Sequence, residues 1–136
     1  MSKRYVAPYI NFAGKAREAM EFYRTVLGGT VVLQTTDDQG TAKPTGSGDR
    51  ISYARLEADG VIIIGSDGHP SYPAKVGDNI ALAVGGTDKD RLTKVFSGLA
   101  EGGKVKGPIA PQPWNAEVGW LIDKFGVNWM VNIEKA

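Results

Sequence analysis

Few side chains in this sequence could carry out catalysis. The 136 residues include one histidine and no cysteine, which excludes disulfides, thiolate zinc sites and cysteine nucleophiles. The histidine, His69, lies between Gly68 and Pro70, a composition that favours a turn, and we expect a solvated loop residue. Ser66 is near it in the sequence, but we expect His69 to lie outside the concave surface where a ligand would bind. No serine–histidine pair and no paired carboxylates for acid–base catalysis are therefore predicted.

The composition is that of an ordinary globular chain. Hydrophobic residues make up 42% and charged residues 23%, and the length indicates a single domain over residues 1–136. Sixteen basic and fifteen acidic residues give a net charge of +1, so no net field attracts nucleic acid or an anionic membrane. The longest apolar run, residues 61–64, is far too short to span a bilayer, and residues 1–4 lack the apolar stretch of a secretion signal. We expect a cytoplasmic protein that binds neither nucleic acid nor membrane.

Hydrophobic spacing predicts alternating strands and helices. Apolar residues recur every three or four positions before two Gly-Gly pairs, 28–29 and 102–103, which predicts a helix ending at each pair. Alternating and β-branched segments predict strands, and the Gly-, Asp- and Thr-rich residues 37–48 predict a loop. The predicted helices are 14–27 and 88–101, and the predicted strands are 5–12, 30–36, 51–57, 61–66, 79–84, 104–109, 118–122 and 127–133.

The second half of the chain repeats the first. A shift of 74 residues places Phe22 on Phe96 and the first Gly-Gly pair on the second, and each half reads β-α-β-β-β. We therefore predict module one over residues 5–67, a linker over 68–77 and module two over 78–136. Two βαβββ modules predict an α+β fold whose strands form a curved mixed sheet or open cup with the helices outside. A ligand would then lie in the concavity.

Three motifs resemble those of a known superfamily. Residues 8–12 (PYINF), followed by Phe22-Tyr23 and Leu27-Gly28-Gly29, resemble the opening of the vicinal-oxygen-chelate superfamily, which includes glyoxalases and bleomycin-resistance proteins. Residues 79–84 (NIALAV) resemble the start of its second module. Residues 123–132 (DKFGVNWMVN) are close to the signature of the PhnB-like branch, also described as a 3-demethylubiquinone methyltransferase-like domain. The resemblance covers essentially the whole chain and implies the glyoxalase/bleomycin-resistance fold.

The resemblance also implies positions for a metal site, and these positions carry unsuitable side chains. Enzymes of the superfamily hold a divalent metal with His, His and Glu, sometimes Gln, and the metal polarises the substrate as a Lewis acid. These positions fall here on Ala7, Asn79 and Met130, and Ile64 is the repeat counterpart of Met130. Ala, Ile and Met offer no hard ligand atom, and Asn79 offers one weak oxygen. We expect no metal and no cofactor.

Strand alternation assigns polar and aromatic residues to one face of the strands. In residues 127–134 the apolar positions alternate with Asn128, Met130 and Asn132, which therefore lie opposite the helix layer. The same parity elsewhere gives aromatic walls with a few neutral amides, which is typical of a site for a flat organic molecule. The alternative is that these residues fill a collapsed cup or a dimer contact. The predicted ligand-binding residues are Tyr9, Asn11, Ile64, Ser66, Asn79, Trp114, Trp120, Met130 and Asn132.

These patterns favour a binding protein over an enzyme. We expect a metal-free, PhnB-like protein that binds a small apolar or aromatic ligand in the cup. The alternative is a lyase- or isomerase-type enzyme of the same superfamily with a remodelled metal site. Methyl transfer would need a cofactor loop, whereas both Gly-Gly pairs follow helices. A third possibility is a structural role for a dimer alone. Uncovered sheet edges predict a homodimer, so the expected partners are a second copy and an unidentified small molecule.

Overall fold

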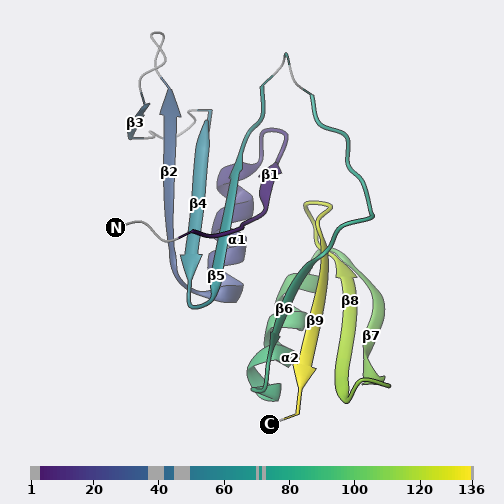
Figure 1. The fold of residues 1–136 in the computed structure, drawn as a ribbon. Coiled ribbons are helices and arrows are strands. Elements are labelled where there is room, and N and C mark those ends of the chain that lie inside the picture. Colours follow the sequence, from purple (N-terminus) through teal and green to yellow (C-terminus); the bar gives the residue numbers. More distant parts are fainter. Residues whose placement is uncertain (1–3, 37–41, 45–49, 70, 72, 136) are drawn as a thin grey trace. The chain divides into compact units, whose positions relative to one another are not determined.

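The computed structural model describes residues 4–36, 42–44, 50–69, 71 and 73–135. The chain divides into two compact units, Met1–Lys75 (unit 1) and Val76–Ala136 (unit 2). In the described part of each unit, one helix packs on one face of a sheet (Figure 1). Unit 1 comprises β1 (Tyr9–Asn11), α1 (Ala16–Leu27), β2 (Thr30–Thr36), β3 (Ala42–Pro44), β4 (Tyr53–Ala58) and β5 (Val61–Ser66). Unit 2 comprises β6 (Leu82–Gly86), α2 (Lys89–Ala100), β7 (Lys104–Gln112), β8 (Ala116–Ile122) and β9 (Asn128–Glu134).

The described strands of unit 1 pair in the order β1-β5-β4-β2-β3. β1 runs parallel to β5, and the other neighbours are antiparallel. Helix α1 packs on β4 and β2 because its apolar residues share one side. Met20 and Tyr23 are fully buried on that side. The helix ends at Gly28, whose φ of 83° lies in the left-handed region that favours glycine.

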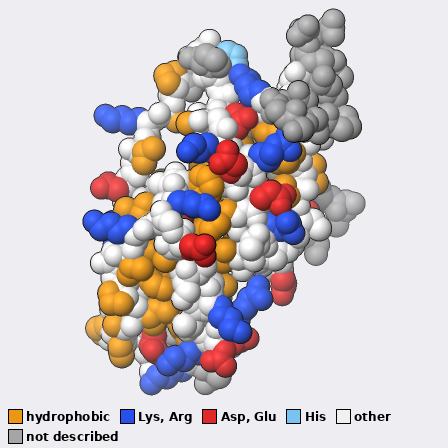
Figure 2. Space-filling model, turned by 180° about the vertical axis from the view of Figure 1, so that it is seen from behind, with side chains coloured by type: hydrophobic (Ala, Val, Ile, Leu, Met, Phe, Trp, Pro, Cys, Tyr) orange, Lys and Arg blue, Asp and Glu red, His pale blue; other side chains and the backbone are white. Residues whose placement is uncertain are grey.

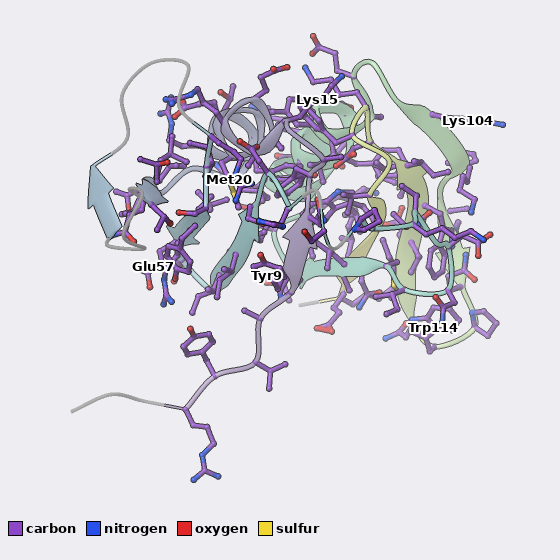
Figure 3. All side chains as sticks on the ribbon, turned by 90° about the horizontal axis from the view of Figure 1, so that it is seen from above. Tyr9, Lys15, Met20, Glu57, Lys104 and Trp114 are labelled. Carbon is purple, nitrogen blue, oxygen red and sulfur yellow. The ribbon has the colours of Figure 1, made fainter. Side chains whose placement is uncertain are left out.

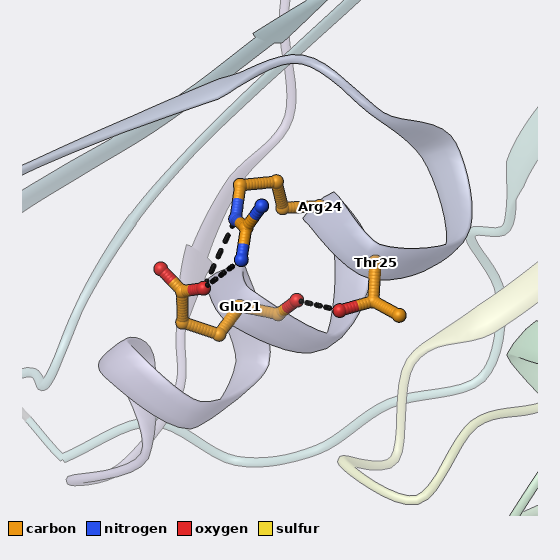
Figure 4. Close-up of polar contacts among 3 residues, drawn as sticks. All are labelled: Glu21, Arg24 and Thr25. Carbon is orange, nitrogen blue, oxygen red and sulfur yellow. Dashed lines mark hydrogen bonds and ion pairs between the residues drawn. The ribbon is translucent and has the colours of Figure 1, made fainter.

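The outer side of α1 is stabilised by local polar contacts. Arg24 donates from Nε and Nη2 to Glu21 Oε2 at 3.0 and 2.7 Å, and the Thr25 hydroxyl donates to the Glu21 carbonyl at 2.9 Å (Figure 4). An exposed pair at this spacing contributes about 0.5 kcal/mol or less. The helix therefore depends mainly on its buried side.

The described strands of unit 2 pair in the order β6-β9-β8-β7, with β6 parallel to β9. Asp88 precedes α2, and its carboxylate accepts a hydrogen bond from the Arg91 amide at 3.1 Å, which caps the helix. Phe96 of α2 packs over Gly119 of β8, where a Cβ would come within 2.5 Å of the Phe96 ring. The glycine thus lets the helix approach the sheet closely.

The predicted fold class is confirmed: the protein is α+β and is built from two modules. Unit 2 has the predicted order β-α-β-β-β, whereas unit 1 has one strand more than predicted, β3. The predicted loop over residues 37–48 is wrong for residues 42–44, because Ala42–Pro44 pairs with β2 and covers its edge. The remaining residues of that loop lie outside the described residues. β7 runs to Gln112, beyond the predicted end at 109, and as an edge strand it can accommodate prolines.

Two predicted strands begin at least three residues later in the structure than predicted. β1 begins at Tyr9 and not at residue 5, because Pro8 has no amide hydrogen to donate to a ladder. β6 begins at Leu82 and not at residue 79, so Asn79 precedes the paired strand. No helix among the residues that the structure describes is long and apolar enough to cross a membrane.

Each sheet has one face under its helix and one face turned away from it, here called the helix-distal face. In β9, Trp129, Val131 and Ile133 are buried toward α2, so the alternate residues lie on the helix-distal face. Gly119 faces α2, and its neighbour Trp120 therefore lies on the helix-distal face of unit 2. In unit 1 the buried residues Ala54, Leu56 and Ile63 face α1 in the same way.

Candidate ligand-binding site

Tyr9 and Ser66 meet on the helix-distal face of unit 1. The parallel pairing of β1 with β5 places Tyr9 beside Ile64 and Asn11 beside Ser66. The Tyr9 hydroxyl lies 2.7 Å from Ser66 Oγ, and Ser66 Oγ also accepts from the Gly68 amide at 3.1 Å. Ser66 is only 5% exposed, whereas Tyr9 is 62% exposed and its side chain projects from β1 (Figure 3). The structure thus brings four predicted residues together and gives the serine hydroxyl a phenol as its partner.

Asn11 shapes the turn that follows β1. Its Oδ1 accepts a hydrogen bond from the Ala13 amide at 2.9 Å, and Ala13 has a φ of 52°. The side chain lies over Gly68, where a Cβ would come within 2.5 Å of Asn11 Oδ1. The oxygen of this side-chain amide is therefore already hydrogen-bonded to the backbone, which leaves the NH₂ group for other contacts.

The sequence reasoning missed a cation on the same face. Arg55 of β4 is paired with Ile64 and donates to the Tyr5 hydroxyl at 2.9 Å and to Glu57 at 2.7 Å. Its Cζ lies 5.0 Å from the centroid of the Tyr5 ring, a cation–π contact. Hydrogen bonds from Arg55 raise its pKa above the usual value, and the bond to Tyr53 contributes most, followed by those to Glu57 and Tyr5. Parity along β4 could have identified Arg55, since it alternates with the buried Ala54 and Leu56.

In unit 2, the register brings Trp120 and Met130 side by side. Trp120 of β8 is paired with Met130 of β9, which is paired with Ala83 of β6. Two residues farther along β9, Asn132 is paired with Gly85. Trp120 remains 41% exposed despite its size. Three predicted residues thus share one continuous surface on the helix-distal face.

A cavity of about 320 Å³ lies beside Trp120, entirely within unit 2. Asn79 and Asn128 contribute amide groups to its wall, and Asp78 and Lys106 contribute one charge of each sign. Its volume is at the lower end of the range for small-molecule sites, about 300–1,000 Å³. The cavity joins Asn79 to Trp120, two of the predicted residues, and adds Asn128, which was not among them.

A larger cavity of about 690 Å³ lies at the start of α1 within unit 1. Arg17, Arg50 and Asp67 are among its lining residues, together with Asn11 and His69. The Asp67 carboxylate accepts from the Ala16 amide at 2.8 Å and from the Ile51 amide at 2.7 Å. Asp67 therefore ties the beginning of α1 to the segment before β4, which is a structural role.

Two residues singled out from the sequence, Trp114 and His69, lie outside the helices and strands. Trp114 is 56% exposed in the turn between β7 and β8 and does not line the 320 Å³ cavity (Figure 3). The structure therefore does not bring it together with Trp120 in that cavity. His69 is exposed, and its Nδ1 accepts a hydrogen bond from the Ser71 amide at 3.0 Å. On the surface that Figure 2 shows, acidic and basic side chains are interspersed.

The positions implied for a metal do not fit one. Ala7 and Ile64 have hydrocarbon side chains, Met130 has a thioether, and Asn79 has a neutral amide. A divalent cation prefers hard oxygen and imidazole ligands, and the side chains of Ala7, Ile64 and Met130 offer neither. Among the residues that the structure describes, no three His, Cys, Asp or Glu side chains gather as a possible metal site. The donor set of this chain is thus unlike that of a metal centre.

Comparison with known proteins identifies the family. The model of the family described as 3-demethylubiquinone-9 3-methyltransferase matches residues 4–132. The chain belongs to this family. Its structure is similar to that of protein PA1353 from Pseudomonas aeruginosa, with a TM-score of 0.83 and 34% identity over 98% of this chain and 100% of that one. This match confirms the resemblance to the 3-demethylubiquinone methyltransferase-like branch that the sequence showed.

Two further relatives span almost the whole chain. Protein YjdN of Escherichia coli (strain K12) is 28% identical over 141 residues, which cover 96% of this chain and 95% of that protein. The putative 3-demethylubiquinone-9 3-methyltransferase, PhnB protein, from Bacillus cereus is 24% identical, with a TM-score of 0.76 over 96% of this chain and 99% of that one. Solved glyoxalase/bleomycin-resistance proteins, 13% identical to this chain, share the fold at TM-scores of 0.63 and 0.61.

Proposed function

We propose that this PhnB-like protein binds a small apolar or aromatic molecule without a metal ion. The observation that supports this most is the 320 Å³ cavity of unit 2, which has the exposed indole of Trp120 and the amide of Asn79 in its wall. Apolar walls with a few polar groups that orient the ligand are typical of small-molecule sites. The ligand would cover the part of the indole that is now accessible to solvent.

The chemistry of the wall explains why binding would not need a metal. Stacking on an indole and hydrogen bonding to amides need no charged ligand atoms. The side chains at Ala7, Asn79 and Met130 could contribute at most one weak oxygen to a cation. Tyr9, Asn11, Ile64 and Ser66 would provide a second polar and apolar surface on the helix-distal face of unit 1.

We also propose that the protein is a homodimer in solution. β1 and β3 are the edge strands of the described sheet of unit 1, and β6 and β7 are those of unit 2. Val6, which precedes β1, is fully exposed, and Ile80, which precedes β6, is 73% exposed. Edges of this kind are commonly covered by a second copy. Light scattering should give twice the chain mass of 14.5 kDa, and a monomer mass at micromolar concentration would contradict the dimer.

A thermal-shift screen of aromatic fragments tests the binding function. Fragments that raise the melting temperature should do so equally with and without EDTA. Trp120→Ala should weaken their binding by about ten-fold or more, as expected for truncation of an aromatic anchor. Val105→Ala is the matched control, because Val105 is an exposed hydrophobic residue of the same sheet that does not line the cavity. Binding that EDTA abolishes, or that Trp120→Ala leaves intact, would contradict the proposal.

A further inference from the structure

Asn128, which lines the unit 2 cavity, carries a buried hydrogen-bond acceptor without a partner among the described residues. This residue begins β9 and lies on the helix-distal face, next to Trp120 in the cavity lining. Its Oδ1 is buried and accepts no hydrogen bond from any described residue. An acceptor that folding removes from water without giving it a donor destabilises the protein. A group that enters the cavity and donates a hydrogen bond would remove this penalty.

The hydrogen bond made by the nitrogen of the Asn128 amide identifies the oxygen as the unpaired atom. Asn128 Nδ2 donates to the Gly77 carbonyl at 3.4 Å. Rotation of the amide by 180° would place two carbonyl oxygens against each other, which is unfavourable, so the donor side faces Gly77. The atom left for another partner is therefore the oxygen, and its partner must be an N–H or O–H group.

The rest of the lining restricts the chemistry of that partner further. Trp120 offers a flat, partly exposed aromatic surface. Asp78 and Lys106 contribute opposite charges and so give the cavity no preference for a charged ligand. A flat, neutral molecule with a donor on its ring would satisfy the indole and the amide oxygen together.

We propose that Asn128 determines specificity by accepting a hydrogen bond, through Oδ1, from an N–H or O–H donor on a flat aromatic ligand that stacks on Trp120. This inference rests on the proposed binding function and adds the class of ligand to it. Asn132 also has a buried Oδ1 without a partner, but it lies four residues farther along β9, roughly 13 Å at the usual rise per residue. The cavity beside Trp120 is lined by Asn128 and not by Asn132, so a small ligand there would meet Asn128.

Indole and benzofuran test this proposal directly. The two rings have nearly the same shape, but benzofuran has an ether oxygen where indole has its N–H donor. Each is titrated into the ¹⁵N-labelled protein, and the signals of the Trp120 Nε1–H and the Asn128 NH₂ group are followed. Wild-type protein should bind indole about ten-fold more tightly than benzofuran, as expected for one hydrogen bond to an otherwise unpaired acceptor.

Variants separate the acceptor from the aromatic wall. Asn128→Leu should bind both probes alike, whereas Asn128→Asp, which keeps an oxygen acceptor, should retain a preference for indole. Gln112→Leu, the same kind of change at an amide outside the cavity, should behave as wild type. Equal wild-type affinities for the two probes, or a preference that persists in Asn128→Leu, would overturn the role of Asn128 while leaving the binding function intact. If neither probe perturbs Trp120 in the wild-type protein, the aromatic site itself is wrong, and the inference fails with it. The wild-type comparison holds even if a variant does not fold.

Discussion

The indole of Trp120 lies against Gly107 of the neighbouring strand. The two residues are paired between β8 and β7, and a Cβ on Gly107 would come within 3.3 Å of Trp120 Cδ1. The absence of a side chain at Gly107 therefore leaves space for the ring across β7. This arrangement keeps one aromatic surface next to the cavity of unit 2.

Gly107→Val should displace the Trp120 ring without unfolding the protein. Gly107 is not among the described glycines with positive φ, so valine can adopt its backbone conformation, but the side chain would occupy space that the ring now fills. Binding of an aromatic probe should weaken several-fold, and the emission maximum of tryptophan should shift. Gly86→Ala is the control, since a Cβ there meets Leu92 at an ordinary 3.7 Å. Unchanged probe binding in Gly107→Val would contradict the role of the ring as a wall.

Tyr9→Phe should destabilise the protein by about 1 kcal/mol, because it removes one partner of the buried Ser66 hydroxyl. Tyr5→Phe removes the phenol that accepts from Arg55 in an exposed contact, and it should cost less. Chemical denaturation of both variants measures the difference. Equal losses would show that burial of Ser66 does not strengthen its contact with Tyr9.

Asp123 gives the motif of residues 123–132 a structural explanation. The carboxylate is 3% exposed, and it accepts from the Phe125 amide at 2.8 Å, from the Val127 amide at 3.1 Å and from Trp129 Nε1 at 2.8 Å. Asp123→Ala would leave these donors unpaired and should cost about 3 kcal/mol. Asp123→Asn keeps one acceptor and should cost less. A urea midpoint of Asp123→Ala equal to that of the wild type would be incompatible with this network.

Strand parity was sufficient for much of the fold but not for the chemistry of the site. In β9 the alternation of Trp129, Val131 and Ile133 with Asn128, Met130 and Asn132 predicts both faces, because a strand buried on one side leaves a clear signal. Parity does not extend into turns, and Trp114 lies in one. It also cannot show which amide atoms the backbone already uses. The side-chain oxygen of Asn11 accepts a hydrogen bond from the Ala13 amide, whereas the side-chain oxygen of Asn128 accepts none from the described residues.

Parity places Arg55 and Asn128 on the helix-distal face but does not show which contacts they make. Arg55 and Asn128 sit on strands that the sequence predicted, but their partners are separated from them in the chain by many residues: Arg55 donates to Tyr5, and Asn128 donates to Gly77. Such contacts depend on register between elements, which hydrophobic periodicity does not specify. That the chain binds a ligand at the residues predicted from the sequence stays a prediction.

The dissociation constant of an aromatic probe in EDTA, measured by calorimetry on wild-type protein and on Trp120→Ala, tests the central claim most directly. Metal-free binding against the indole predicts that the wild-type constant is the same with and without the chelator, and that Trp120→Ala raises it about ten-fold or more. A wild-type protein that loses the probe in EDTA, together with a Trp120→Ala protein that binds as well as the wild type, would contradict the account.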